Sequence, residues 1–474
     1  MTDPKGIKLS VAIKRSLDLL LQEVPVIRKI VHSIFDAGGH PLLVGGVVRD
    51  LLLKRPAKDL DIEVHGLTMD QLSAILRCFG RVSYVGKSFG VLCLHGLDVD
   101  WSLPRRDSAG RKPKVIVDPT LSVRDAFARR DLTMNAMGID LVSYRLLDPF
   151  DGRQDIKDNV LRCPDARFFT QDPLRFYRVM QFIGRFEMYP DDMLQKICRT
   201  MDIRGVSVER IDEEFRKLLL QSKWPSLGIR WLHDLGRLSQ ILPELADTID
   251  VPQPANWHPE GDVFEHTMQT LDAAAQLHYK DKETHLIMLY AALSHDLGKP
   301  ETTKKIKGRW CSHGHAEVGV ALTRAMLGRI VQKKSIIAAV CKLVKYHMVP
   351  PQFIEDDASL VAYKRLANKL GKRVTLQMLA DISLCDRRGR NMRSHKPLMR
   401  KMLVIDRFIS RAREAGVLAG PEEPILQGRD LTGEIRPGKE MGDLLRYAYR
   451  IQLEEGIRSR RELKRRVLAH KGRS

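Results

Sequence analysis

The sequence of 474 residues lacks any run of about 20 apolar residues, the length that a helix needs to cross a bilayer. Its first residues, MTDPKGIKLS, contain no apolar segment of the kind that secretory signal peptides carry. Its seven cysteines are widely scattered, and no two of them form a CxxC pair. These absences argue against a membrane-spanning protein, a disulfide framework and a thiolate zinc site. They predict a cytoplasmic protein with reduced thiols.

Acidic residues are fewer than basic ones. The chain has 59 Asp and Glu residues and 79 Lys and Arg residues, which gives a formal net charge of +20. Phosphates attract distributed Lys and Arg side chains and release counterions on binding. The excess of basic residues therefore predicts a polyanionic partner. A membrane surface is the alternative interpretation. The basic run at 458–474 is either a solvated helix face or a nucleic-acid contact.

Strand signals are confined to about the first 160 residues. Alternation over 60–64 predicts a strand whose buried face carries Leu60, Ile62 and Val64. After about residue 165, helical patterns follow one another almost without strand signals. The sequence therefore predicts an α+β protein with a mixed head and an all-helical remainder. Other predicted elements are helices at 25–36 and 47–53 and strands at 42–44, 82–85, 90–96 and 114–118.

The strand at 60–64 and the residue before it place Asp59, Asp61 and Glu63 on one face, because alternate strand residues point the same way. The carboxylates of Asp59 and Asp61 suit one or two hard cations such as Mg²⁺, and a pair of these ions suits nucleotidyl transfer. Asp100, which follows a strand-like run, is a candidate third carboxylate. A D-x-D pair by itself also fits a solvated strand edge.

A glycine turn stands just before the helix at 47–53. Gly45 and Gly46 let the backbone approach a phosphate closely, and the helix N-terminus adds a favourable dipole with Arg49 nearby. A bound metal ion and an anionic substrate together reconcile an acidic site with a basic chain.

Five stretches form an ordered set of motifs: GGVVRDLLL…DLDIEV (45–64), RRDLTMNAMGID (129–140), DPFDG (148–152), QDPLRFYR (171–178) and VSVERIDEEFRKLLL (206–220). With these motifs the chain resembles the class II tRNA nucleotidyltransferases and bacterial poly(A) polymerases of the polymerase-β-like superfamily. Five motifs in order are far more specific than a single glycine-rich turn. The resemblance implies a polymerase-β-like head, with a small mixed sheet and helices, followed by a helical neck.

The resemblance also implies roles for individual residues. Asp59 and Asp61 would bind catalytic Mg²⁺, with Asp100 as a third ligand. Gly45, Gly46, Arg49, Arg130 and Arg178 would contact the nucleotide, chiefly its phosphates, Asp131 and Asn135 would lie near the ribose, and Asp172 and Arg175 would bond to the edge of the base.

The implied base contacts predict selection of CTP and ATP, because a carboxylate accepts from the exocyclic amine that both bases carry. Two positions depart from the family: Gln171 replaces a common glutamate and Gln181 a common arginine. A glutamine can orient Arg175 by hydrogen bonding but does not neutralise it, so the nucleotide preference stays open. Outside such a motif, Arg175 and Arg178 would be taken as solvated helix residues.

A second set of residues, His266, His295, Asp296 and Asp386, resembles the H…HD…D pattern of the HD phosphohydrolase superfamily. Imidazoles and carboxylates suit a divalent metal ion that activates water against a phosphoester. The alternative is an HD fold that is kept only as a helical body. His313, His315 and His347 are candidate extensions of this site, although each alone fits a surface or capping histidine.

The resemblance extends over nearly the whole chain and predicts a CCA-adding tRNA nucleotidyltransferase with tRNA, CTP and ATP as partners and no membrane. A poly(A) polymerase or a partial CC- or A-adding enzyme is the nearest alternative, and an HD phosphohydrolase with an inactive head, or a pure RNA-binding protein, is more distant.

The predicted divisions are an N-terminal extension (1–24), the head (25–164), an RNA- and nucleotide-binding neck (165–250), an HD domain (262–395) and a basic helical tail (396–474), with 250–263 as the linker before the HD domain.

Overall fold

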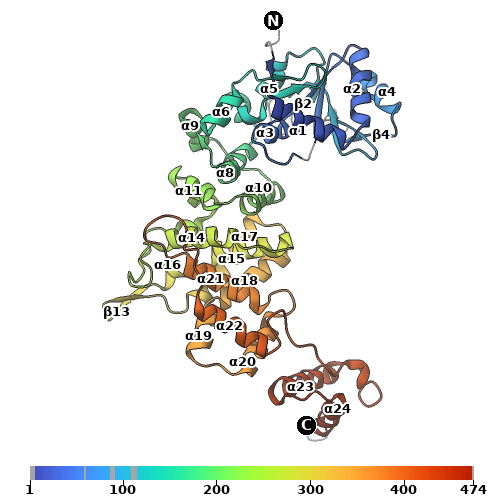
Figure 1. Cartoon of the computed structure of the whole chain (residues 1–474). Helices are drawn as coiled ribbons and strands as arrows, with labels where there is room; N and C mark the ends of the chain where they lie inside the picture. Colours follow the sequence, from blue (N-terminus) through green and yellow to red (C-terminus); the bar gives the residue numbers. More distant parts are fainter. Residues whose placement is uncertain (1–5, 58–59, 86–90, 108–114, 472–474) are drawn as a thin grey trace. The chain divides into compact units, whose positions relative to one another are not determined.

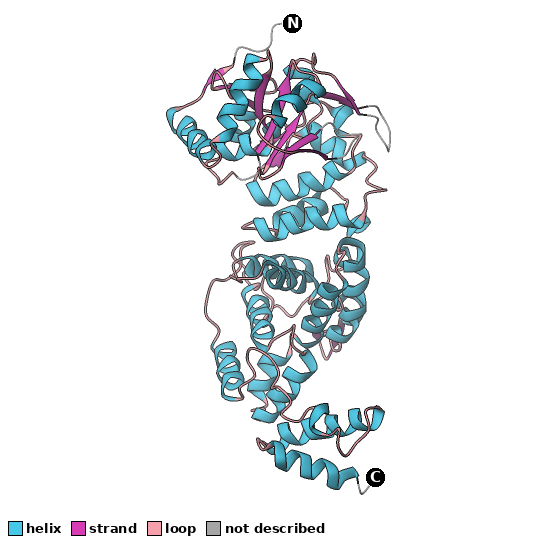
Figure 2. Cartoon of the chain, turned by 90° about the vertical axis from the view of Figure 1, so that its right-hand side faces the viewer, coloured by secondary structure: helices cyan, strands magenta, loops and turns pink. Residues whose placement is uncertain are grey.

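The chain divides into two compact units, Met1–Arg210 and Ile211–Ser474. Figure 1 labels their helices and strands, and Figure 2 shows a strand-rich sheet in the first unit and an almost wholly helical second unit. None of the described helices is both long enough and apolar enough to cross a membrane. The computed structural model describes residues 6–57, 60–85, 91–107 and 115–471.

An eight-stranded sheet forms the centre of the first unit, in the order β1 (Ile7–Lys8), β10 (Arg145–Leu147), β9 (Gly138–Asp140), β2 (His40–Val44), β3 (Leu60–His65), β6 (Val99–Ser102), β5 (Val91–Leu94) and β4 (Val82–Val85). Neighbouring strands are antiparallel, except that β3 and β6 are parallel. The predicted strand at 114–118 forms instead a separate hairpin, β7 (Arg105–Asp107) with β8 (Val115–Val117).

Side-chain alternation along β3 separates the core from the site. Leu60, Ile62 and Val64 are buried in one apolar core, as the sequence predicts. Asp61 therefore faces the opposite side of the sheet, where Val44 belongs to a second core.

The N-terminal residues are part of the head. β1 pairs with β10, and helix α1 (Val11–Gln22) buries Leu17 and Leu21 in the core that also holds Ile62. Residues 7–22 lie in the predicted N-terminal extension (1–24). They add a strand and a helix to the first unit. A two-residue strand carries too little pattern for prediction, since its partner lies far along the chain.

Helices make up most of the remainder. In the first unit these are α2 (Val26–Asp36), α3 (Gly46–Leu52), α4 (Met69–Arg77), α5 (Val123–Ala128), α6 (Gly152–Asp158), α7 (Ala166–Phe169), α8 (Leu174–Phe186), α9 (Asp192–Thr200) and the start of α10 (Val208–Gln221). The second unit adds α11 (Ser226–Asp234), α12 (Leu238–Ile241), α13 (Pro243–Ala246), α14 (Val263–Ala275), α15 (Lys282–Ser294), α16 (Lys299–Thr302), α17 (His315–Ile330), α18 (Lys334–Tyr346), α19 (Val349–Glu355), α20 (Leu360–Leu370), α21 (Leu376–Arg388), α22 (Leu403–Glu414), α23 (Lys439–Glu455) and α24 (Arg460–Lys471). Short elements are 3₁₀ turns η1 (Thr133–Asn135) and η2 (Gly428–Asp430) and strand pairs β11 (Val160–Leu161) with β12 (Tyr189–Pro190) and β13 (Lys304–Ile306) with β14 (Arg309–Cys311).

Helix α15 is the centre of the second unit. It is buried from Leu286 to Ser294, as expected for a helix that is apolar on every side. It packs with α14, α18 and α21. Asp262, Asp281 and Thr375 begin α14, α15 and α21 by accepting backbone N–H groups of the first turn. These caps set where each helix starts and so where its polar side chains lie.

Candidate functional site

The head places two carboxylates side by side on neighbouring parallel strands. Asp61 of β3 is in register with Asp100 of β6, so the two side chains share one face of the sheet. Both line a cavity of about 300 Å³. The Cys93 thiol donates a hydrogen bond to Asp100 Oδ1 at 3.1 Å. Asp59, the other predicted ligand, lies outside the described residues.

The turn between β2 and α3 lies against these carboxylates. Gly45 has a φ of +78°, which favours glycine. A Cβ at this position would lie 3.0 Å from Arg130 Nη1 and 3.6 Å from Asp61 Oδ2. Gly45 therefore allows the backbone to approach both the acidic and the basic side of the site.

Arginines line one side of the cavity, and the buried carboxylate of Glu63 pairs with one of them, Arg130. Glu63 Oε2 lies 3.6 Å from Arg130 Nη2, and Glu63 Oε1 lies 3.1 Å from His65 Nε2. Burial opposes ionisation of Glu63, but His65 and Arg130 lower its pKa below the ordinary value. The lining arginines are Arg105, Arg129, Arg130 and Arg175. Glu63, Arg105 and Arg129 are site residues that the sequence did not predict, although Glu63 lies on the predicted face of β3 and Arg129 begins a predicted motif.

Four of the predicted nucleotide contacts bind one another. Arg178 Nε donates to Asp131 Oδ2 at 2.5 Å, and Asn135 Nδ2 donates to Asp131 Oδ1 at 2.9 Å. Burial opposes ionisation of Asp131, yet Arg178 and Asn135 lower its pKa to about 2. Arg49 Nη1 donates to Asn135 Oδ1 at 2.7 Å, and its other nitrogens pair with Asp50. Arg49 is only 6% exposed, and its contact with a nucleotide phosphate stays a prediction.

The residues predicted to read the base also have protein partners. Arg210 Nη2 lies 3.0 Å from Asp172 Oδ2. The Arg175 guanidinium donates to the backbone carbonyls of Phe168 and Arg129 at 2.7 and 2.5 Å. The structure thus anchors the two side chains separately.

The two family departures lie in different surroundings. Gln181 on α8 is 1% exposed, and its Oε1 accepts from Arg185 Nη1 at 3.0 Å, whereas Gln171 is exposed. The structure therefore pairs Gln181 with Arg185, one helical turn away, and not with Arg175.

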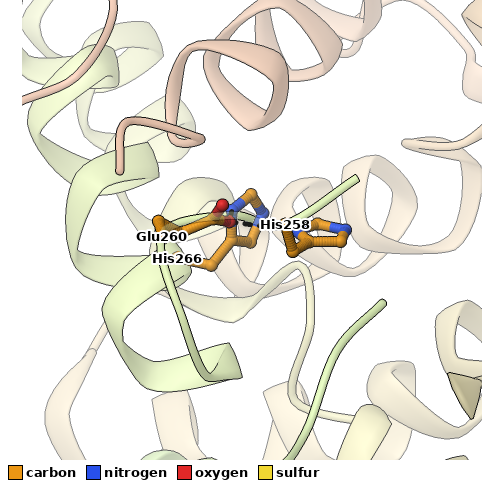
Figure 3. Close-up of side chains that lie close together, drawn as sticks. All are labelled: His258, Glu260 and His266. Carbon is orange, nitrogen blue, oxygen red and sulfur yellow. Dashed lines mark hydrogen bonds and ion pairs between the residues drawn. The ribbon is translucent and has the colours of Figure 1, made fainter. Parts of the chain in front are cut away.

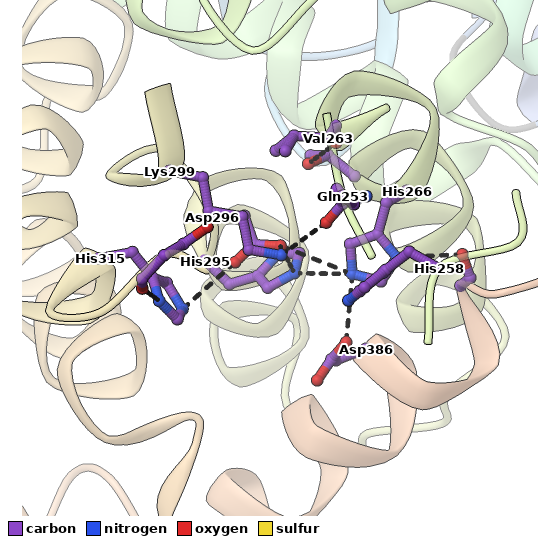
Figure 4. A network of polar contacts seen from close by, with 12 residues as sticks. Gln253, His258, Val263, His266, His295, Asp296, Lys299, His315 and Asp386 are labelled. Carbon is purple, nitrogen blue, oxygen red and sulfur yellow. Dashed lines mark hydrogen bonds and ion pairs between the residues drawn. The ribbon is translucent and has the colours of Figure 1, made fainter. Parts of the chain in front are cut away.

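In the second unit, all four residues of the predicted HD pattern come together and are buried (Figure 4). His266 Nε2 lies 3.2 Å from His295 Nε2 and 3.1 Å from Asp386 Oδ1. Asp296 Oδ2 lies 3.1 Å from His295 Nε2. The residues come from α14, the end of α15 and α21, so three packed helices build the site.

The protonation of this cluster follows from its contacts. Burial disfavours a charged His266, but hydrogen bonds with Asp386 and Glu260 raise its pKa to about 9. Burial also opposes ionisation of Asp386, yet Arg390 and His266 hold its pKa well below its usual range. The cluster therefore holds a protonated His266 against ionised carboxylates, and a divalent ion that binds the imidazole has to displace a proton.

The segment predicted as a linker, 250–263, contributes to the same site (Figure 3). Glu260 Oε1 lies 2.7 Å from His266 Nδ1 and 2.9 Å from His258 Nδ1. A carboxylate that holds the far nitrogen of a ligating histidine orients the ring. His258 and Glu260 were missed because Pro, Gly and Asp dominate this segment and indicate only a loop.

Two of the three weaker histidine candidates complete a second group. The ligand atoms of Asp296, His315 and His347 lie within 4.8 Å of one another, and all three residues are buried. His313 is exposed and lines the nearby cavity of about 670 Å³, together with Lys299, His315 and Asp386 among others.

Models of three protein families match the chain: the poly A polymerase head domain at 42–162, the probable RNA and SrmB-binding site of polymerase A at 191–249, and the HD domain at 263–388. The multifunctional CCA protein of Stenotrophomonas maltophilia is 34% identical over 315 residues, which are 63% of this chain and 74% of the relative. That of Pasteurella multocida is 32% identical over 364 residues, which are 73% of this chain and 83% of the relative. The chain belongs to the multifunctional CCA protein family.

The fold agrees with this membership. The CCA-adding enzyme of Bacillus stearothermophilus, solved in complex with CTP, superposes with a TM-score of 0.60 and 18% identity, covering 94% of this chain and 98% of that enzyme. The predicted α+β class with a polymerase-β-like head is confirmed. The three matched ranges lie within the predicted head, neck and HD domain, whose exact boundaries stay a prediction.

A multifunctional CCA protein with these two domains uses divalent metal ions, and the donors of this chain fit such ions. In the head the donors are carboxylate oxygens, which hard cations prefer. In the HD domain, Asp296 Oδ2 is buried 3.1 Å from His295 Nε2 and pairs with Lys299 Nζ at 2.7 Å. Imidazole nitrogens beside a carboxylate are donors that divalent ions bind.

Glutamates within the basic tail neutralise part of its positive charge. Arg465 and Arg466 both pair with Glu462, and Lys464 Nζ lies 3.0 Å from Glu434 Oε1. Solvent screens exposed pairs of this kind, so a phosphate competes with them readily. Contact of the tail with nucleic acid stays a prediction.

Proposed function

We propose that this chain adds C, C and A to the 3′ ends of tRNA from CTP and ATP and releases pyrophosphate. The observation that carries the proposal is the juxtaposition of Asp61 and Asp100 beside the Gly45 turn and a wall of arginines. A tRNA substrate supports the cytoplasm as the place of action.

The acidic residues of the site would bind metal ions, and the basic residues would bind the triphosphate. Asp61 and Asp100, with Asp59, would hold Mg²⁺, which when bound lowers the pKa of an attacking hydroxyl and neutralises leaving phosphate charge. The arginine wall binds the triphosphate, and Glu63 keeps Arg130 in place. The tRNA 3′-oxygen then forms a bond to the α-phosphorus, and the bond to pyrophosphate breaks.

Base selection would use Asp172 and Arg175. Asp172 is paired with Arg210 at an exposed position, so the exocyclic amine of C or A has to replace one charged partner. Arg175 uses two of its five N–H donors for the backbone carbonyls that position it, so it can donate to a base without losing either contact. We infer that nucleotide binding rearranges the pair of Asp172 with Arg210, and that G and U fail because their edges present no matching amine.

A second activity, phosphoester hydrolysis, is favoured by the four buried HD residues beside the cavity of about 670 Å³. His266, His295, Asp296 and Asp386 would hold a divalent ion that activates water. Lys299, Arg387 and Arg390 line the cavity and would bind the phosphate group of the substrate.

The deciding experiment incubates the protein with tRNA that lacks its CCA end and with each labelled nucleoside triphosphate, separately and together. We expect C to be added first and A only after C. Asp61→Asn removes a metal ligand and should abolish addition, while Asp98→Asn, an exposed change just before β6, should leave it intact. His295→Ala should abolish hydrolysis of a chromogenic phosphodiester and spare nucleotide addition.

Other outcomes identify the alternatives. Long A runs mean a poly(A) polymerase, and addition of only C or only A means a partial enzyme. No incorporation with intact hydrolysis would leave the HD activity alone. Loss of both activities in Asp61→Asn would contradict two independent sites.

A further inference from the structure

We propose that the loop between α21 and α22, residues 389–402, binds backbone phosphates of the tRNA. The inference rests on the tRNA substrate proposed above and adds a surface that binds it. Asp61 and Asp100 belong to the first unit and the loop to the second, so the loop lies outside the nucleotide-adding site.

The loop carries positive charge without negative charge. Five of its fourteen residues are Lys or Arg, and none is Asp or Glu. Arg390 pairs with Asp386 of the HD site at 2.8 Å, whereas the other four cations are exposed and have no carboxylate partner among the described residues. These four are Arg393, Lys396, Arg400 and Lys401. The basic tail differs, because its arginines pair with its own glutamates. The charge of the loop is therefore available to an anionic partner.

A buried side chain holds the loop in place. Gln269 of α14 is only 1% exposed, and its Nε2 donates to the carbonyl oxygen of Asn391 at 3.1 Å while its Oε1 accepts the N–H of Asn391 at 3.0 Å. The Asn391 side chain in turn donates to the carbonyl oxygen of Lys396 at 2.8 Å and accepts the N–H of Arg393 at 3.0 Å. The backbone that carries the cations is thus fixed before a partner arrives, which lowers the entropy cost of binding. Solubility alone does not require such an anchor.

Two further contacts fix the loop and extend its positive surface. Arg388 Nε, at the end of α21, donates to the carbonyl oxygen of Arg400 at 3.2 Å. Lys396 Nζ lies 5.4 Å from the ring centroid of Trp224, and Lys223 Nζ lies 5.2 Å from it. Lys223 is exposed as well. The positive surface therefore continues from the loop to the residues before α11.

Exposed apolar side chains beside these cations bear on the kind of partner. Met392, Met399 and Leu403 are 70%, 59% and 75% exposed. Cations with apolar side chains also fit an anionic bilayer, but interfacial anchors present both on an amphipathic helix, and residues 389–402 form no helix. The planar guanidinium group of arginine matches the oxygens of a phosphate, and tRNA is the polyanion on which the proposed activity acts. RNA is therefore the partner that fits the loop.

The test replaces three loop cations together in the full chain, by Arg393→Gln, Arg400→Gln and Lys401→Gln. Fluorescence anisotropy measures the affinity for tRNA that lacks its CCA end, between about 50 and 200 mM KCl. Each lost phosphate contact removes about 0.9 from the slope of the logarithm of the binding constant against that of the salt concentration. We therefore expect the slope to fall by about 2–3 and the dissociation constant to rise roughly tenfold. In nucleotide addition, the KM for tRNA should rise and the KM for CTP should not.

Two matched variants separate a binding site from a general effect of charge. Lys280→Gln, Lys282→Gln and Lys369→Gln together remove three exposed cations elsewhere in the same unit and should change neither the affinity nor the slope. Arg393→Lys with Arg400→Lys keeps the charge, so it should keep the slope. In hydrogen exchange, the loop of the parent chain should become protected when tRNA binds. All substituted side chains are exposed, so every variant should unfold at the temperature of the parent.

The outcomes separate the inference from the proposed function. Unchanged affinity and slope in the triple loop variant overturn the inference, and so does an equal loss in the control. Lost binding to phosphatidylglycerol vesicles with unchanged tRNA affinity would overturn it in favour of a membrane surface. If the parent binds tRNA through the loop but adds no nucleotide, the proposed function fails and the inference stands. A parent that does not bind tRNA overturns both.

Discussion

Replacing Asp131 by asparagine tests whether the head is held together by the network that joins its predicted nucleotide contacts. Asp131 is 8% exposed and accepts from Arg178, Asn135 and the backbone N–H of Leu132. Asparagine has the same shape, but its amide group presents donors where the carboxylate accepted. Arg178 then loses the anion that it faces.

The magnitude follows from the ionisation of the carboxyl group. Its pKa falls from 3.8 to about 2 on folding, and each pH unit corresponds to 1.36 kcal/mol, so ionised Asp131 stabilises the head by about 2.5 kcal/mol at pH 7. Because the folded pKa is the lower one, this stabilisation is present above about pH 4. It is lost as the pH falls towards 2.

Urea unfolding followed by hydrogen exchange of peptides from β9 in the head and α8 in the neck reports on the first unit. Asp131→Asn should lower the free energy of unfolding by about 2–3 kcal/mol at pH 7, and the difference from the parent should shrink between pH 4 and pH 2. Asp36→Asn, the same change of charge at an exposed position at the end of α2, is the control. A difference below about 0.5 kcal/mol at pH 7, or one independent of pH, would refute the reasoning.

Two further changes test packing and buried charge. In Gly152→Ala the new Cβ would lie 2.2 Å from the carbonyl oxygen of Thr133, so we expect a loss of about 3 kcal/mol in head stability by the same urea assay; a loss under about 1 kcal/mol would show that the backbone yields. Burial raises the pKa of Asp272 to about 7 despite the hydrogen bonds from Ser226, so the contribution of this group to stability is largest below about pH 4 and is lost as the pH rises to 7. In Asp272→Asn the amide oxygen still accepts from Ser226 N–H and the amide NH₂ donates to the Ser226 hydroxyl, so the variant should gain about 2–4 kcal/mol at pH 8, with a flatter pH profile by thermal unfolding. An unchanged profile would contradict a buried neutral carboxyl group.

Local patterns in the sequence determined much of this protein. Alternation gave β3 its buried face and put Asp61 on the other, because strand geometry depends only on neighbouring residues. The H…HD…D pattern named four residues that the structure brings together, because each stands at a recognisable point of a helix.

Only the tertiary structure determined which contacts form between segments that lie far apart in the chain. The register that sets Asp100 beside Asp61, the burial of Arg49 against Asn135, and the place of α1 in the head depend on pairings between segments far apart in the chain. Glu260 looked like part of a linker, and His347 like a helix cap, until packing placed Glu260 against His266 and His347 beside Asp296. Periodicity reports which face of an element is apolar, but only the packed fold determines which polar groups meet on the other side.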